Sequence, residues 1–105
     1  MKCIETNLKG CYLIEPKVIE DGRGYFMEAF HHQKFYENTG IQSHFVQDNQ
    51  SHSKYGVVRG LHIQKGEFAQ AKLVRVLFGK ILDVAVDVRK NSPTFGQHFS
   101  VKLSS

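Results

Sequence analysis

The sequence lacks the features that would place the protein in a membrane or in a disulfide-stabilised scaffold. Its 105 residues hold two cysteines, Cys3 and Cys11, whose spacing matches no metal motif, and thiols are the form expected in the cytoplasm. No apolar run exceeds a few residues, so no segment is long enough to cross a bilayer, and the N-terminus has no signal core. We therefore expect a cytoplasmic protein with no membrane partner.

Blocks of like charge are also absent, although the protein is basic. Fourteen lysines and arginines against ten acidic residues give a net charge of +4, and the basic residues are scattered singly along the chain. A protein that binds duplex nucleic acid usually concentrates its positive charge in a stripe or patch. The pattern favours a small phosphate-bearing ligand over a nucleic acid.

The remaining composition is that of one β-rich globular domain covering residues 1–105. Hydrophobic residues make up 41% and charged residues 23%, as in ordinary soluble proteins. The segment 31–40 predicts the one helix, closed by Gly40, and turns are expected at 20–24, at Gly79-Lys80 and at 89–96. β-branched and aromatic runs predict seven strands, which together indicate an antiparallel sandwich or barrel: 11–19, 24–30, 43–49, 57–64, 69–78, 80–88 and 97–103.

The predicted strand "VVRGLHIQ", residues 57–64, carries unusual chemistry for a buried strand. His62 is compatible either with a core histidine bonded to a carbonyl or with a functional imidazole. Strict alternation puts Arg59 and His62 on opposite faces, unless Gly60 marks a bulge. In the next predicted strand Lys72 shares a face with apolar residues, and a buried cation would need a partner.

Several motifs, in order along the chain, carry a family resemblance. "EPKVIEDGRGYFMEAF", "FVQDNQSHS", "RGLHIQ" and "QAKLVRVLFGKILDVAVDVRKNSPTFG" resemble the dTDP-4-dehydrorhamnose 3,5-epimerases, a branch of the cupins. The resemblance runs from about Asn7 to Leu103. It implies an all-β fold, the N-terminal part of a cupin-type jelly roll (double-stranded β-helix), with one short helix near 31–40.

The resemblance also implies a reaction without metal or cofactor. In such epimerases a base removes a proton beside the C4 ketone of a dTDP-linked 4-keto-6-deoxyhexose, and protonation from the other face inverts C3, C5 or both. The matching catalytic residues are His62 as base and Lys72 as stabiliser of the enolate oxygen. The positions that match substrate-binding residues are Arg23, Glu28, Gln47, Asn49, Arg59 and Asp83, of which Arg23 and Glu28 resemble residues that reach a neighbouring subunit's nucleotide site.

The family pattern continues beyond position 105, where it supplies a tyrosine that acts as the opposing acid and an aspartate that orients the histidine. Without that acid we expect a rate lower by about two to four powers of ten. A partial jelly roll leaves open strand edges and an uncovered apolar face. We therefore expect a homodimer.

Three other functions compete with this interpretation. A metal-dependent cupin would use His62 and Glu67, but such sites usually contain a His-x-His pair, and glutamine occupies the paired position here. A non-catalytic module would keep Arg23, Arg59 and Lys72 to bind the sugar nucleotide without turning it over. A nucleic-acid binder rests on net charge alone.

Overall fold

The computed structural model describes all residues, 1–105, and the chain divides into two compact units. Unit 1 contains Met1–Gln42 together with Arg75–Ser105, and unit 2 is Ser43–Val74. All the strands and the α-helix belong to unit 1, whereas unit 2 contains only one turn of 3-10 helix, η1 (Gly66–Phe68). The regular secondary structure therefore lies outside the segment that holds most of the predicted site residues.

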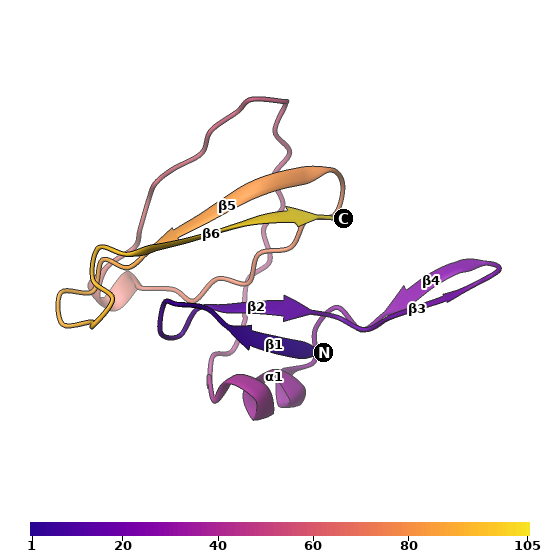
Figure 1. The fold of residues 1–105 in the computed structure, drawn as a ribbon, viewed down its shortest axis with the longest axis horizontal. Helices are drawn as coiled ribbons and strands as arrows, with labels where there is room; N and C mark the ends of the chain where they lie inside the picture. Colours follow the sequence, from indigo (N-terminus) through magenta and orange to yellow (C-terminus); the bar gives the residue numbers. More distant parts are fainter. The chain divides into compact units, whose positions relative to one another are not determined.

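Unit 1 is built from three separate two-stranded antiparallel sheets and one helix (Figure 1). β1 pairs with β2, β3 with β4, and β5 with β6. The elements are β1 (Lys2–Glu5), β2 (Tyr12–Glu15), β3 (Val18–Asp21), β4 (Gly24–Met27), α1 (His32–Thr39), β5 (Lys80–Val86) and β6 (His98–Ser104). β1 was not predicted from the sequence, and its partner β2 is only the first half of the predicted strand 11–19.

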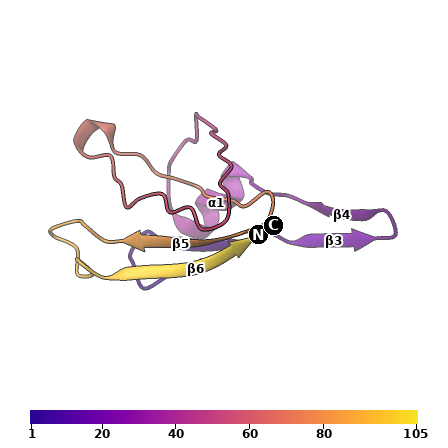
Figure 2. The same ribbon diagram turned by 90° about the horizontal axis from the view of Figure 1, so that it is seen from above.

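The β3–β4 hairpin forms where the glycine-rich turn predicted it. Asp21 pairs with Gly24, which leaves Gly22 and Arg23 as a two-residue turn. Gly24 has a φ of 131°, a conformation that residues with a side chain rarely adopt. Pro16 separates β2 from β3 because proline has no N–H to donate to a strand ladder. Figure 2 shows the hairpin extending away from the other strands of unit 1 as a two-stranded ribbon.

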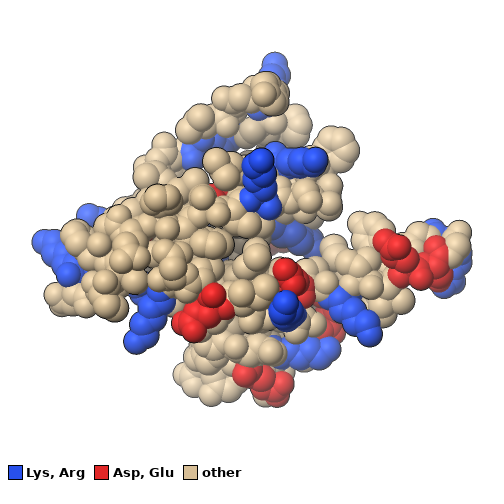
Figure 3. Space-filling view, viewed as in Figure 1, with Lys and Arg blue, Asp and Glu red and all other residues tan.

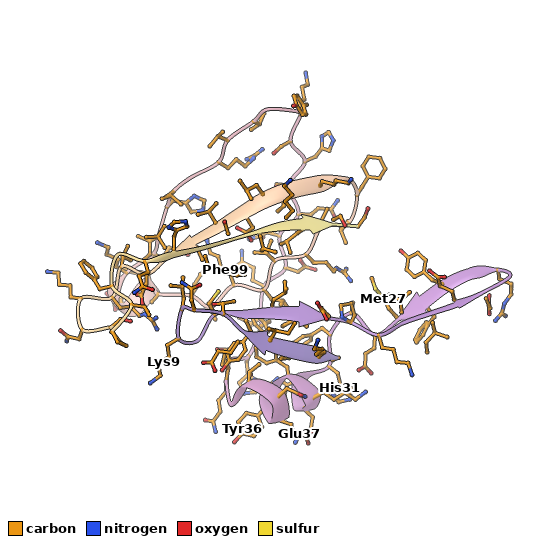
Figure 4. All side chains as sticks on the ribbon, in the orientation of Figure 1. Lys9, Met27, His31, Tyr36, Glu37 and Phe99 are labelled. Atoms are coloured by element: carbon orange, nitrogen blue, oxygen red, sulfur yellow. The ribbon has the colours of Figure 1, made fainter.

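The helix α1 confirms the prediction for residues 31–40, including its end. The His31 ring accepts a hydrogen bond from the Lys34 amide at 3.4 Å at the N-terminus. Gly40, with a φ of 69°, donates its N–H to the Tyr36 carbonyl at 2.8 Å and ends the helix. Phe35 is buried, whereas Tyr36 and Glu37 lie on the exposed side of α1 (Figure 4). The helix thus packs through one apolar residue.

The β5–β6 hairpin is closed by a loop that is organised around Asp87. This carboxylate is only 4% exposed and accepts hydrogen bonds from Arg89, Ser92 and Thr94, the two from Arg89 side-chain nitrogens at 2.8 and 2.9 Å. The predicted turn at 89–96 is therefore confirmed. The predicted hairpin at Gly79-Lys80 is wrong, because the only strand that pairs with β5 is β6.

Three predicted strands, 43–49, 57–64 and 69–78, are not formed, and these predictions were wrong for the described chain. Their alternating apolar residues favour the β-strand conformation, but a strand forms only when its backbone N–H and C=O groups pair with those of a neighbouring strand. No segment of the 105 residues pairs with them. Their hydrophobic side chains stay exposed as a result, Val46 by 91% and Val58 by 88%.

The apolar core is very small for a chain of this length. Leu8 and Phe35 are the only buried hydrophobic residues, although a chain of this size is able to enclose a larger core. On the β3–β4 hairpin Tyr25 and Phe26 are each 69% exposed, and on β5 Leu82 is 65% exposed. The uncovered apolar face expected from the sequence is therefore present. The structure contains no helix with the length and apolar character needed to span a membrane.

Candidate functional site

The eight predicted site residues are divided between the two units. Unit 1 holds Arg23 in the β3–β4 turn, Glu28 just after β4, and Asp83 in the middle of β5. Unit 2 holds the other five, and these comprise both predicted catalytic residues: Gln47, Asn49, Arg59, His62 and Lys72.

His62 lies in an extended segment whose alternation is interrupted at Gly60. The φ of Gly60 is 117°, and the peptide that joins it to Leu61 is cis. An atom at the Cβ position of Gly60 would lie 3.5 Å from the His62 Nδ1, so the imidazole ring packs next to this glycine. The strand predicted at 57–64 is not formed, so the bulge that would bring Arg59 and His62 to one face of it is not observed.

We predict that Gly60→Ala disturbs His62 more than the same substitution at another glycine of unit 2 that has a positive φ. A side chain at a φ of 117° costs about 1–3 kcal/mol, which relaxation of the backbone next to the ring would relieve. Gly56→Ala is the matched control, because Gly56 also has a positive φ, 81°, but has no atom within 4 Å of its Cβ position. NMR shifts of the His62 ring are expected to move in the Gly60 variant alone, and equal shifts in both variants would contradict the prediction.

Polar residues upstream of His62 are tied together by short-range hydrogen bonds. The Gln47 side-chain amide donates to the Asn49 side-chain carbonyl at 3.2 Å, so the two predicted substrate contacts lie side by side. Arg59 donates from Nε to the Ser53 hydroxyl at 2.8 Å and from Nη2 to the His52 carbonyl at 3.4 Å. These bonds hold the Arg59 guanidinium against the loop that precedes it.

Lys72 is not the embedded cation that the strand pattern predicted. Its segment forms no strand, and the residue is exposed, so its charge is hydrated and needs no buried partner. No hydrogen bond joins Lys72 to His62 in unit 2. In the 105 residues no three histidine, cysteine or acidic side chains gather closely enough to hold a metal ion, and His62 and Glu67 therefore belong to no such group.

Asp83 is a carboxylate on an otherwise apolar face of the β5–β6 sheet. It is half-buried and lies opposite Val101, while Ala85 lies opposite Phe99 on the same face. Lys72 and Arg75, the cations of the predicted strand 69–78, do not pair with Asp83 across a sheet, because that strand is not formed. Asp83 makes no hydrogen bond or ion pair, and a half-buried carboxylate without a partner is a candidate for a functional role.

Glu28 is held by a residue that sequence reasoning missed. The Lys34 ammonium on α1 donates a hydrogen bond to the Glu28 carboxylate at 2.8 Å, and this bond lowers the pKa of Glu28. Both side chains are about half exposed, so the pair contributes little to stability. It does fix where the carboxylate lies relative to the helix.

Arg23 also has a neighbour that was not singled out from the sequence. The carboxylate of Asp21 forms an ion pair with its guanidinium, and acidic and basic side chains lie against one another at the end of this hairpin (Figure 3). The hydrogen bonds from Arg23 lower the pKa of Asp21, and the same pairing raises the pKa of Arg23. The two-residue spacing across a glycine turn was a signal that was available in the sequence.

Comparison with known proteins gives one consistent family. The family model described as dTDP-4-dehydrorhamnose 3,5-epimerase matches residues 5–105. The enzyme of that name from Salmonella typhimurium is 52% identical over the whole chain, which covers 57% of that relative. The one from Methanothermobacter thermautotrophicus is 56% identical over 96% of the chain and 54% of its own length. The chain thus spans little more than half the length of these relatives.

Solved structures agree with this family in backbone as well as in sequence. One match is the crystal structure of dTDP-4-dehydrorhamnose 3,5-epimerase from Elizabethkingia anophelis, with a TM-score of 0.94 and 60% sequence identity. The match covers 99% of the present chain and 57% of the chain in that crystal structure. A second match is a 3,5-epimerase from Legionella pneumophila, solved in complex with dTDP-4-keto-L-rhamnose, with a TM-score of 0.91 and 50% sequence identity. This match covers 98% of the present chain and 54% of the Legionella chain. The predicted fold class, part of a cupin-type jelly roll, is confirmed by these matches.

Proposed function

Because the chain belongs to the dTDP-4-dehydrorhamnose 3,5-epimerase family, we propose that it acts in the epimerisation of a dTDP-linked 4-keto-6-deoxyhexose. The observation that carries this proposal is that the match extends over nearly the whole chain, in sequence and in backbone together. The Legionella neighbour, whose structure holds a dTDP-keto-sugar, supports the substrate class.

The proposed chemistry needs a base, an oxyanion stabiliser and groups that hold the nucleotide sugar. The His62 imidazole accepts the proton from C3 or C5, and the electron pair of the broken C–H bond moves into the C4 carbonyl as an enolate. The Lys72 ammonium stabilises the negative oxygen, because a fixed charge lowers the energy of the state in which the opposite charge develops. Return of a proton to the other face of the same carbon gives the epimer, with no net change in atoms or electrons.

The other predicted residues are proposed to bind the substrate. Gln47, Asn49 and Arg59 supply amide and guanidinium groups from unit 2, and their hydrogen bonds to neighbouring side chains support a fixed geometry. Arg23 and Glu28 supply charged groups from unit 1, each with an ion-pair partner. For Asp83, the supporting observation is its lack of any partner on an apolar face.

We also propose a homodimer located in the cytoplasm. The exposed Ile19 and Phe26, which lie opposite each other on one face of the β3–β4 hairpin, support association, because exposed apolar surface of this kind often marks a contact with another chain. Sedimentation of the protein at several concentrations tests the stoichiometry. A species that stays at the mass of one chain across the whole range would contradict the dimer.

Incubation with a dTDP-4-keto-6-deoxy sugar in D₂O tests the proposed activity against the non-catalytic alternative. An epimerase base exchanges the C3 or C5 hydrogen with solvent even when inversion is incomplete, so we expect deuterium at one or both carbons. Mass spectrometry of the recovered sugar nucleotide measures the incorporation. Binding of the sugar nucleotide without any incorporated deuterium would favour the binding module over the enzyme.

A further inference from the structure

The Arg23 side chain is oriented by a single carboxylate through several hydrogen bonds. Its Nε donates to the two Asp21 oxygens at 3.2 and 3.4 Å, and its Nη2 donates to Asp21 Oδ2 at 2.5 Å. The Arg23 backbone N–H also donates to Asp21 Oδ1, at 2.8 Å. One carboxylate thus holds both the backbone of the turn and one edge of the guanidinium.

This pairing leaves the other edge of the guanidinium available to a ligand. An arginine carries five N–H donors in a rigid plane, and Asp21 accepts from Nε and from one Nη2 hydrogen. Both Nη1 hydrogens and the second Nη2 hydrogen remain, on a side chain that is 90% exposed. An ion pair this exposed contributes little to folding, so its main physical effect is on the direction in which Arg23 points.

We propose that Asp21 is a positioning residue for Arg23, which presents its free edge to the dTDP moiety of the sugar nucleotide. This proposal rests on the proposed function, in which Arg23 binds the nucleotide. Guanidinium groups bind phosphate through two parallel N–H donors, and a side chain that is oriented before binding loses less conformational freedom on binding. Asp21 itself does not touch the ligand.

Because Asp21 is negatively charged, the direction in which its removal changes dTDP affinity distinguishes a positioning role from simple repulsion. A carboxylate near a bound diphosphate repels it, so removal of that charge alone would strengthen dTDP binding. Loss of a positioning contact has the opposite effect, because Arg23 then has to be ordered when the ligand binds. We expect Asp21→Asn to weaken dTDP binding about three- to tenfold, measured by titration of the 105-residue protein with dTDP.

The matched control is Glu20→Gln, which removes the same charge one residue away. Glu20 lies in β3 opposite Tyr25, and it is not a partner of Arg23. Glu20→Gln is expected to leave the affinity unchanged or slightly higher, and Asp21→Glu, which keeps the carboxylate, is expected to recover part of the loss. An Asp21→Asn protein that binds dTDP as tightly as the unmodified chain, or more tightly, would overturn the positioning role.

Two further measurements separate failure of this proposal from failure of the proposed function. If the unmodified chain does not bind dTDP, or if Arg23→Gln binds it equally well, the nucleotide-binding role of Arg23 fails and the positioning proposal fails with it. If Arg23→Gln weakens binding but Asp21→Asn does not, only the positioning role fails. Exchange of the Arg23 Nε–H with solvent, followed by NMR, is expected to accelerate in Asp21→Asn even without ligand.

Discussion

Replacement of His62 by asparagine is expected to slow solvent exchange at C3 and C5 of the keto sugar by about two to four powers of ten. Asparagine is similar in size and forms hydrogen bonds, but it accepts no proton at neutral pH. The rate of deuterium uptake from D₂O measures the effect. Affinity for dTDP should change little, because the imidazole is proposed to act on the sugar ring and not on the nucleotide.

His44→Asn is the matched control for this experiment. His44 lies in the same unit as His62 but outside every motif that carries the family resemblance. Its replacement is expected to leave exchange within about twofold of the unmodified chain. Equal losses in the two variants would indicate a general effect on unit 2, and undiminished exchange in His62→Asn would exclude His62 as the base.

Replacement of Asp87 by asparagine is expected to open the loop between β5 and β6. The substitution removes the charge that Arg89 pairs with and weakens the bonds from Ser92 and Thr94. Amide exchange reports this directly, because the Asp87 amide donates to the Gln97 carbonyl and the Gly96 amide to the Asp87 carbonyl. We expect these two amides to exchange about 10- to 100-fold faster, since bonds to a charged group are the strongest in such loops.

The same loop is expected to open in acid. Hydrogen bonds from Arg89, and then from Ser92 and Thr94, hold the pKa of Asp87 far below its ordinary value of 3.8. A carboxyl group with a lowered pKa in the folded state stabilises that state above its ordinary pKa, and the stabilisation is lost as the pH falls. Protection of the Gly96 amide should therefore be constant above about pH 5 and decline progressively below about pH 4 in the unmodified chain. In Asp87→Asn this decline should be absent.

The parts of the fold that local chemistry determines were predictable from the sequence. Gly40 ends the helix because a left-handed residue is needed there, and the turn at 20–24 closes a hairpin because glycine tolerates the required backbone. The loop at 89–96 likewise contains the side chains that donate hydrogen bonds to Asp87, and these lie within a few residues of it in the sequence. Such signals act between residues that are close in sequence.

Strand pairing was less predictable because it depends on segments distant in sequence. The runs at 57–64 and 69–78 have the composition of strands, yet the 105 residues contain no partner for them. Conversely, β1 has only four residues and a weak pattern, and its pairing with β2 makes it a strand. The prediction of a hairpin at Gly79-Lys80 was wrong for the same reason, since β5 pairs with β6, a strand nearly twenty residues later in the sequence.

In the candidate site, the residues themselves were predicted from the sequence, whereas their charge partners were less predictable. Its eight residues follow from motifs, but their charge partners depend on the reach of side chains in three dimensions. Lys34 meets Glu28 only because α1 folds back near the end of β4, which no periodicity in the sequence reveals. Asp21 is an easier case, since it lies two residues before Arg23 in a turn that the sequence did predict.

The scarcity of shielded apolar side chains has a calorimetric consequence. The heat-capacity increment of unfolding is proportional to the nonpolar area that becomes hydrated, and Leu8 and Phe35 are the only hydrophobic residues that are buried. The 105-residue chain should therefore absorb less heat per residue than an ordinary domain and melt gradually. A sharp endotherm would arise only once another polypeptide covers Tyr25, Phe26 and Leu82.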